Sequence, residues 1–456
     1  MQFGIDRLLA DPTLRAPLAG RRVALLAHPA SLTQDLTHSL DALAACPEIK
    51  LGAAFGPQHG LRGDKQDNMV ETADYADPAL GIPVFSLYGE VRRPTEAMLD
   101  AFDVILVDLQ DLGCRIYTFV TTLRYVLEAA AAHGKSVWLL DRPNPAGRPI
   151  EGLRLRAGWE SFVGAGPLPM RHGLTLGELG GWFVRTLKLD VDYRVIPMTG
   201  WAPDAAPGYG WPLGERAWIN PSPNAPNLWM ARAYAGSVML EGATLSEGRG
   251  TTRPLELFGA PDLDARQVIA EMQSLAPAWL AGCQLRDCWF EPTFHKHVGR
   301  LCAGVQIVTE GHAYDHAAFR PWRLMALAFK AIRRLHPTYD LWRDFAYVGV
   351  FRRERLRAVG DAVAVGEQKA ARTHHRARAS DREPHARGLH FRAPSGRDVD
   401  PVSSLHFGDW KALERPEPLV GAGSERRERN ERRQGDAGFR TLVLDHAATE
   451  TRRAPS

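Results

Sequence analysis

Polar side chains that can bind hydroxyl groups and move protons follow several short apolar runs in the first half of the chain. His59 lies in a Gly-Pro-Gln-His-Gly cluster after one run. Asp108 and Asp111 follow another, and Arg142 and Asn144 follow a third. If the runs are parallel strands, their carboxyl ends meet at one edge of a sheet, where ligands bind. We therefore expect these side chains to converge on one site, although each cluster alone also fits an ordinary loop after a strand.

Three further polar strings lie in Gly- and Pro-rich loops of the second half. They contain Arg171 with His172, then Asn224, and finally Glu247 with Arg249. Gly and Pro impose particular backbone shapes, and ordered loops of this kind commonly carry functional groups. The alternative roles remain open: a structural ion pair for each Arg, a loop salt bridge for Glu247, turn formation beside Pro for Asn144 and Asn224, and a structural hydrogen bond for His59 and His172.

The elements that must position these groups alternate between strand and helix patterns. Short apolar runs predict buried strands at Val23–Ala27, Leu51–Phe55, Val84–Leu87, Val104–Val107 and Val137–Leu140. Between the last two, Ile116–His133 carries apolar residues at three- and four-residue steps, which predicts a helix. This alternation predicts an α/β fold with a Rossmann-like, doubly wound and mostly parallel sheet over residues 1–150.

The pattern changes from residue 151 to about 345. Helices are expected at Thr175–Leu187, Ala265–Ala281 and Ala317–His336, and strands at Arg194–Met198 and Gly304–Thr309. We expect a smaller mixed α+β domain that completes a cleft with the first. Neither a GxGxxG motif after the first strand nor a GxxxxGK[ST] motif occurs, which disfavours a dinucleotide or P-loop site.

Charge is unevenly distributed along the 456 residues, whose formal net charge is +3. From Phe351 onward there are 22 Lys and Arg against 16 Asp and Glu, whereas the rest has 34 against 37. The mildly acidic body argues against nucleic acid as its ligand. Residues 346–456 form an Arg-rich tail that cannot bury enough apolar surface to fold alone, so we expect disorder or a frameshift; a nucleic-acid-binding tail is the alternative.

Targeting signals and cysteines indicate neither an exported protein nor a zinc site. The N-terminus lacks the basic start and apolar run of a signal peptide, and no apolar stretch is long enough to span a membrane. A cytoplasmic location is expected, and a missed leader with export is the alternative. The five cysteines contain no CxxC pair, which disfavours a zinc site. His295 and His297 are too little evidence for a metal.

Eight ordered strings resemble the exo-β-N-acetylmuramidase family of the NamZ type, formerly a domain of unknown function. The resemblance covers roughly residues 3–345. The matching strings are Phe55–Gln66, Pro83–Gly89, Asp108–Phe119, Leu140–Gly147, Met170–Leu179, Asn220–Asn227, Leu245–Pro261 and Phe290–Gln306. The family implies release of non-reducing-end N-acetylmuramic acid from peptidoglycan fragments, with a muropeptide or muramic acid glycoside as substrate and no cofactor.

One position departs from the resemblance. Many family members carry Glu where this chain has Gln58, and an amide cannot donate a proton as a carboxylic acid does. Either the acid lies elsewhere or the activity differs. For an acid elsewhere, Glu247 is the preferred carboxyl and Asp111 the alternative. His59 or His172 could then carry protons, and Gln58 would orient the acetamido group or a water. Two rival functions remain: a non-catalytic muropeptide-binding protein, and a Rossmann-type enzyme acting on a phosphosugar or nucleotide.

The resemblance also indicates which groups would bind the substrate. The lactyl carboxylate requires an Arg with two parallel donors, and the ring hydroxyls require Asp, Asn or His. The expected substrate-binding residues are Arg62, Asp108, Arg115, Tyr117, Arg142, Asn144, Arg171, His172, Asn224 and Arg249.

Overall fold

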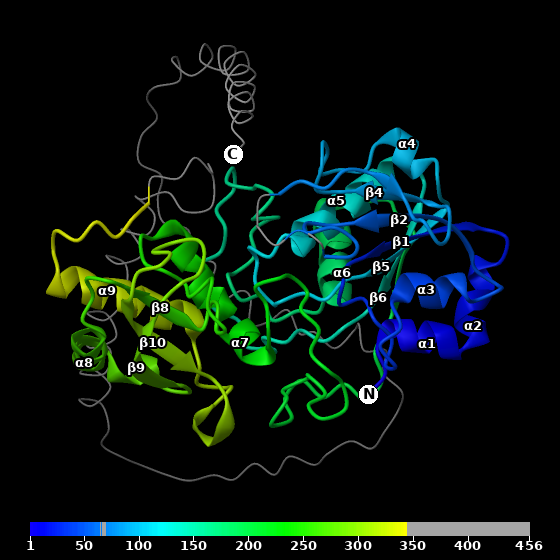
Figure 1. The fold of residues 1–456 in the computed structure, drawn as a ribbon. Coiled ribbons are helices and arrows are strands. Elements are labelled where there is room, and N and C mark those ends of the chain that lie inside the picture. The colour runs from blue at the N-terminus through cyan, green and yellow to red at the C-terminus, as the bar shows by residue number, and fades with distance from the viewer. Residues whose placement is uncertain (64, 66–69, 344–456) are drawn as a thin grey trace, which may run out of the picture. The chain divides into compact units, whose positions relative to one another are not determined.

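The N-terminal half of the protein is built around a seven-stranded sheet. The computed structural model describes residues 1–63, 65 and 70–343 (Figure 1). The strand order is β3-β4-β2-β1-β5-β6-β7, and all pairs are parallel except β3 with β4. The strands are β1 (Arg22–Ala27), β2 (Lys50–Gly56), β3 (Tyr75–Ala76), β4 (Pro83–Ser86), β5 (Val104–Asp108), β6 (Ser136–Leu140) and β7 (Tyr193–Ile196).

Both faces of this sheet are covered because its central strands are apolar on both sides. In β5, Ile105 and Val107 pack into the core on one face, while Val104 and Leu106 pack into the core on the other. The helices of this half are α1 (Gly4–Ala10), α2 (Pro12–Arg15), α3 (Ser39–Ala44), α4 (Glu96–Leu99), α5 (Phe119–Ala132) and α6 (Leu176–Leu187). Helices α1 and α3 lie on one face and α5 and α6 on the other (Figure 1). The predicted α/β sheet with helices on both faces is therefore confirmed.

The chain leaves β1 toward β2 on one side and returns to β5 on the other side of β1. This reversal creates a crevice outside the carboxyl ends of β1 and β5, which is the usual ligand position in open α/β sheets. Strand β7 continues the sheet past residue 150, where the sequence placed the end of the first domain. The division into domains stays a prediction.

A smaller antiparallel sheet follows, with the order β8-β10-β9. Its strands are β8 (Leu257–Ala260), β9 (Gln284–Phe290) and β10 (Cys302–Val308), and its helices are α7 (Leu228–Ser237), α8 (Ala265–Leu275) and α9 (Pro321–Leu335). Helix α9 packs against α7 and α8, and α8 packs against β9 and β10. The expected smaller α+β part is present, and the tail from residue 346 lies outside the described residues.

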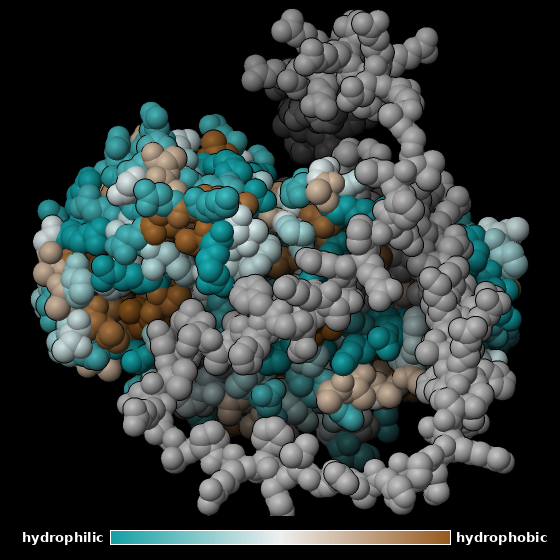
Figure 2. Space-filling model, turned by 180° about the vertical axis from the view of Figure 1, so that it is seen from behind, coloured by the Kyte–Doolittle hydropathy of each residue, from teal (hydrophilic) through white to brown (hydrophobic). Residues whose placement is uncertain are grey.

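The surface of the described part is mixed in character. The view from behind shows hydrophobic residues in separate patches among hydrophilic ones (Figure 2). No helix within residues 1–63 and 70–343 combines the length and the apolar character that crossing a membrane requires.

Candidate functional site

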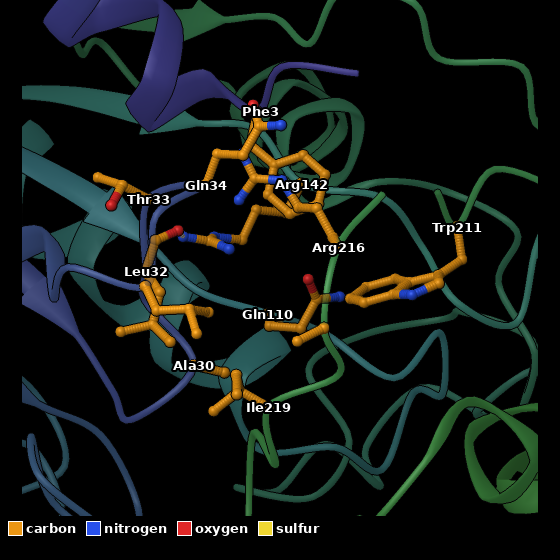
Figure 3. Close-up of a pocket in the computed structure, with 12 residues that line it drawn as sticks. Phe3, Ala30, Leu32, Thr33, Gln34, Gln110, Arg142, Trp211, Arg216 and Ile219 are labelled. Carbon is orange, nitrogen blue, oxygen red and sulfur yellow. Dashed lines mark hydrogen bonds between the residues drawn. The ribbon is translucent and has the colours of Figure 1, made fainter. Parts of the chain in front are cut away.

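A pocket opens where β1 and β5 end (Figure 3). Its walls come from the residues after β1, the first residues after β5 and β6, the start of the chain, and the segment from 211 to 219. They are Phe3, Ala30, Leu32, Thr33, Gln34, Leu36, Gln110, Arg142, Trp211, Arg216, Ala217 and Ile219. The pocket thus occupies the crevice that the strand order creates, and its lining combines seven apolar residues with five polar ones.

Asp108 and Arg142 form a buried ion pair behind this pocket. Arg142 donates from Nε to Asp108 Oδ1 at 2.5 Å and from Nη2 to Oδ2 at 2.9 Å. Ser39 also donates to Asp108 Oδ2, at 2.5 Å, and Asp108 is fully buried. Both carboxylate oxygens of Asp108 already accept hydrogen bonds, so neither is available to a sugar hydroxyl in this structure. The main effect of Asp108 is to hold the Arg142 guanidinium in place.

Asp111 and His172 form a second buried pair on the same sheet edge. His172 Nε2 lies 3.1 Å from Asp111 Oδ2, which also accepts from the Gly113 N–H at 2.8 Å. His172 Nδ1 accepts from the Leu174 N–H, so Nε2 is the nitrogen that carries the proton. Asp111 is 3% exposed, and its Oδ1 has no hydrogen-bond partner among residues 1–63 and 70–343. One carboxylate oxygen is therefore held while the other is left for a ligand.

Contacts between the polar strings hold them together. Tyr117 donates from its hydroxyl to Ser222 Oγ at 3.2 Å and packs edge-to-face against Tyr234 of α7. Burial raises the pKa of Tyr117 strongly, so its phenol stays protonated. Asn227 then donates to Glu256 Oε1 at 2.8 Å. The strings at 108–119, 220–227 and 245–261 are therefore in contact through these residues, whereas the expectation that Asp108 and Asp111 face Asn224 and Glu247 across one cleft stays a prediction.

Asn144 closes a turn. Its Oδ1 accepts from the Ala146 N–H at 2.9 Å, and its Nδ2 donates to the Leu174 carbonyl at 3.0 Å. A Cβ added to Gly113 would meet Asn144 Oδ1 at 2.2 Å, so only Gly fits beside this turn. The structure thus gives Asn144 the turn-forming role that the sequence left open. Asn224 is half-buried in its own loop.

Gln58 and its neighbours follow β2. Thr118, the N-cap residue of α5, donates from Oγ1 to Gln58 Oε1 at 2.8 Å, and Gln58 is half-buried. His59 is buried, with Nδ1 2.8 Å from the Lys65 carbonyl oxygen. Arg62 is partly exposed and lies 3.3 Å from Asp41 Oδ1. Gln58 therefore lies on the same sheet edge as Asp111.

Arg171 and Arg115 bind main-chain carbonyls instead of facing a cavity. Arg171 is 0% exposed; its guanidinium donates to the Ala146 carbonyl and, at 3.2 Å, to the Phe319 carbonyl. Burial lowers its pKa to about 10, which leaves it cationic at neutral pH. Arg115 donates to the Leu153 and Leu168 carbonyls at 2.7 and 2.6 Å. Both arginines therefore stabilise loop positions here, and a role in reading a carboxylate stays a prediction.

Glu247 lies inside a cluster of positive groups. Its carboxylate is 2.6 Å from Lys296 Nζ and 3.2 Å each from Arg249 Nε and His295 Nδ1, and it is fully buried. Burial alone would raise the pKa of Glu247, but His295, Lys296 and Arg249 outweigh it and hold the pKa far below its usual range. A general acid must be protonated at its working pH. This environment does not suit the proton-donor role that the sequence suggested for Glu247.

Arg249 is likewise engaged, because Nη2 donates to Glu241 Oε1 at 2.6 Å. His297 Nε2 lies 2.9 Å from the Thr244 carbonyl oxygen, and His295 contacts Glu247, so the His pair has structural partners. Within the described ranges, no three His, Cys, Asp or Glu side chains are grouped to hold a metal ion.

Several pocket residues were missed by sequence reasoning. Gln110 lies inside the 108–119 string, in which only its charged neighbours Asp108 and Asp111 were predicted as site residues. Trp211, Arg216 and Ile219 precede the 220–227 string in a segment without helical or strand periodicity. The available signal was the pair of Trp residues at 211 and 218 in an otherwise Gly- and Pro-rich stretch.

Comparisons with known proteins agree with the strings and the fold. Two family models, described as exo-beta-N-acetylmuramidase NamZ, N-terminal and C-terminal, match residues 23–229 and 232–374. The second match extends beyond residue 345, where the resemblance was expected to end. The peptidoglycan beta-N-acetylmuramidase NamZ of Bacillus subtilis (strain 168) is 38% identical over 361 residues, which cover 79% of this chain and 83% of that protein.

Two crystal structures of DUF1343 family proteins from Bacteroides fragilis NCTC 9343 also resemble this chain. The first is 30% identical with a TM-score of 0.65, and the match covers 74% of this chain and 83% of that one. The second is 25% identical with a TM-score of 0.60, over 79% and 91% of the two chains.

Proposed function

The chain belongs to the exo-β-N-acetylmuramidase NamZ family, and on that premise we propose that it is a glycoside hydrolase releasing non-reducing-end N-acetylmuramic acid from peptidoglycan fragments. The observation that carries the proposal is the 38% identity to a peptidoglycan β-N-acetylmuramidase across 83% of that protein's length. The pocket at the sheet's carboxyl edge supports it, because walls of mixed polar and apolar character beside the buried Asp108–Arg142 pair suit a terminal sugar.

Asp111 is the carboxyl that we assign to the reaction. Glycoside cleavage passes through a positively charged, oxocarbenium-like state that a nearby carboxylate stabilises. His172 and the Gly113 N–H hold Asp111 Oδ2, whereas Oδ1 has no partner within the described ranges. Glu247 differs because each of its oxygens lies within 3.2 Å of a positive group, Oε1 beside Arg249 and His295 and Oε2 beside Lys296. These contacts support Asp111 as the charge-stabilising or water-activating group and Glu247 as a structural anion.

Gln58 is assigned a positioning role. Its amide is oriented by the Thr118 hydroxyl on the sheet edge that carries Asp111, but it cannot protonate a leaving oxygen. An enzyme with an amide at this point would act best on glycosides whose leaving groups need little protonation. This assignment keeps the second candidate, a muropeptide-binding protein without turnover, as a specific alternative that Gln58 favours.

The experiment that separates the two is direct product detection. The purified full-length chain is incubated with the disaccharide N-acetylmuramyl-β-1,4-N-acetylglucosamine, and free N-acetylmuramic acid is followed by mass spectrometry. Hydrolysis predicts equal amounts of the two monosaccharides over many turnovers. Binding of the disaccharide in calorimetry without any monosaccharide release would instead support the binding-protein function.

A further inference from the structure

Gln110 carries an acceptor that the protein leaves unused. Its Nε2 donates to the Asp111 carbonyl at 3.0 Å and to the Pro143 carbonyl at 2.9 Å, so reversing the amide would place Oε1 against both of these carbonyl oxygens. Its Oε1 has no hydrogen-bond partner within residues 1–63 and 70–343, although Gln110 is only 1% exposed. Buried polar atoms are normally paired, so an unpaired oxygen in a pocket wall indicates a ligand that donates a hydrogen bond.

Arg142 supplies a donor at the same pocket. Its Nε and Nη2 are occupied by Asp108 and the Leu32 carbonyl, whereas no hydrogen bond is made by Nη1 in the described part of the chain. Figure 3 shows the guanidinium and the Gln110 amide on neighbouring sides of the pocket. Asp108 already neutralises Arg142, and Asp6 pairs with Arg216, the second arginine of the pocket, so the walls carry little net charge, which favours a neutral polar ligand over an anion.

Apolar side chains form another part of the pocket wall. Leu32, Trp211 and Ile219 form walls that border the donor and the acceptor (Figure 3). A secondary amide matches this arrangement: its C=O accepts from Arg142, its N–H donates to Gln110, and an attached methyl group lies against the apolar walls. A single hydroxyl would leave the apolar walls uncovered, and a carboxylate would face the Gln110 oxygen.

We propose that this pocket binds a methyl-bearing secondary amide of the substrate through Arg142 Nη1 and Gln110 Oε1. The inference rests on the proposed function, since the substrate offers two such groups. One is the acetamido group of the terminal sugar, and the other is the amide that joins its lactyl group to the first alanine of a peptide stem. Gln110 directly precedes Asp111 in the chain, so the bound amide lies near the segment that carries the carboxyl assigned to the reaction.

The test fills the pocket and measures binding and turnover separately. Ile219→Trp inserts a large ring from a half-buried wall position, and Leu213→Trp places the same ring on an exposed site of the same segment as the control. The probes are N-acetylmuramic acid, muramic acid with a free amine, and N-acetylmuramoyl-L-alanine. Binding to the native chain and both variants is measured by ligand-observed NMR titration, with thermal unfolding to confirm that each variant is folded.

If the acetamido group occupies the pocket, the native chain binds N-acetylmuramic acid on the order of tenfold more tightly than muramic acid, and Ile219→Trp removes that difference while Leu213→Trp keeps it. If the stem amide occupies it, the lost preference is for N-acetylmuramoyl-L-alanine over N-acetylmuramic acid. A native chain that distinguishes none of the three probes, or a preference unchanged in folded Ile219→Trp, overturns the inference. Hydrolysis by the same samples is measured independently of binding. An active enzyme whose pocket does not distinguish the probes contradicts this inference alone. An inactive protein whose pocket does distinguish them contradicts the proposed function alone.

Discussion

Lys296 Nζ lies 2.6 Å from Glu247 Oε2, and this contact holds the loop before β10 against the loop that follows Leu245. Lys296 also donates to the Leu240 and Ala243 carbonyls, and Thr293 donates from its N–H to the Gly250 carbonyl beside it. Glu247 is therefore the anion at the centre of an interlocked loop pair.

Replacing Glu247 should lower the free energy of unfolding, with no direct effect on the chemical step. Glu247→Gln leaves Lys296 buried without its anion, and breaking one side of a buried ion pair typically costs about 3–5 kcal/mol. We expect the free energy of unfolding in urea to fall by about that amount. The double variant Glu247→Gln with Lys296→Met should recover part of it. A fully stable Glu247→Gln with turnover reduced by about 10²–10⁴-fold would instead make Glu247 a proton donor.

Asp111→Asn should lower turnover and leave stability nearly unchanged. The amide oxygen can keep the contacts with His172 and the Gly113 N–H, so we expect little change in the unfolding midpoint. The negative charge at the reacting centre is lost, and kcat should fall by about 10²–10⁴-fold. Asp108→Asn is the matched control, because it breaks the buried pair with Arg142 and should lower stability. Unchanged turnover in folded Asp111→Asn would remove Asp111 from the reaction.

Gln58→Glu should change how strongly the hydrolysis rate depends on the acidity of the leaving group. A carboxyl at this position, next to the Thr118 hydroxyl, can protonate the departing oxygen. We expect a clear increase in kcat for the natural disaccharide, whose leaving alkoxide needs a proton, and a smaller change for a 4-nitrophenyl glycoside. Steady-state rates across leaving groups of different acidity measure this slope. An identical slope in native chain and variant would show that position 58 does not face the leaving oxygen.

Asp141 makes stability depend on pH. Burial raises its pKa to about 7, against an ordinary value of 3.8, although Gly177, Thr175 and Arg142 donate to it. The folded state therefore holds this proton more tightly than the unfolded state. The stabilisation is present below about pH 4 and is lost as the pH rises through 7, at about 1.4 kcal/mol per pKa unit. Urea unfolding at pH 5 and pH 8 should show a smaller fall for Asp141→Asn than for the native chain. Equal falls would contradict the raised pKa.

The sequence predicted the sheet because its central strands are short, apolar and bounded by turn residues. The predicted runs at Val23–Ala27, Val104–Val107 and Val137–Leu140 coincide with β1, β5 and β6 within one residue at each end. The common position of the polar residues that follow β1, β2, β5 and β6 also followed from topology, since parallel strands end at one edge.

The depth of each polar group could not be predicted in the same way. Arg171 and Glu247 lie in strings as polar as any other, yet both are fully buried against partners distant in sequence, Phe319 and Lys296. Spacing along the chain carries no information about such partners. The pocket wall at Trp211 and Ile219 was missed for a related reason, because an irregular segment has no periodicity from which its inward side can be read.

The most direct measurement compares two chromogenic glycosides with the full-length chain. The 4-nitrophenyl β-glycosides of N-acetylmuramic acid and N-acetylglucosamine differ only in the lactyl group, and both release the same coloured phenol. We predict steady release from the muraminide and little from the glucosaminide. No release from the muraminide by folded protein that still binds muropeptides would contradict hydrolysis and identify the chain as a binding protein.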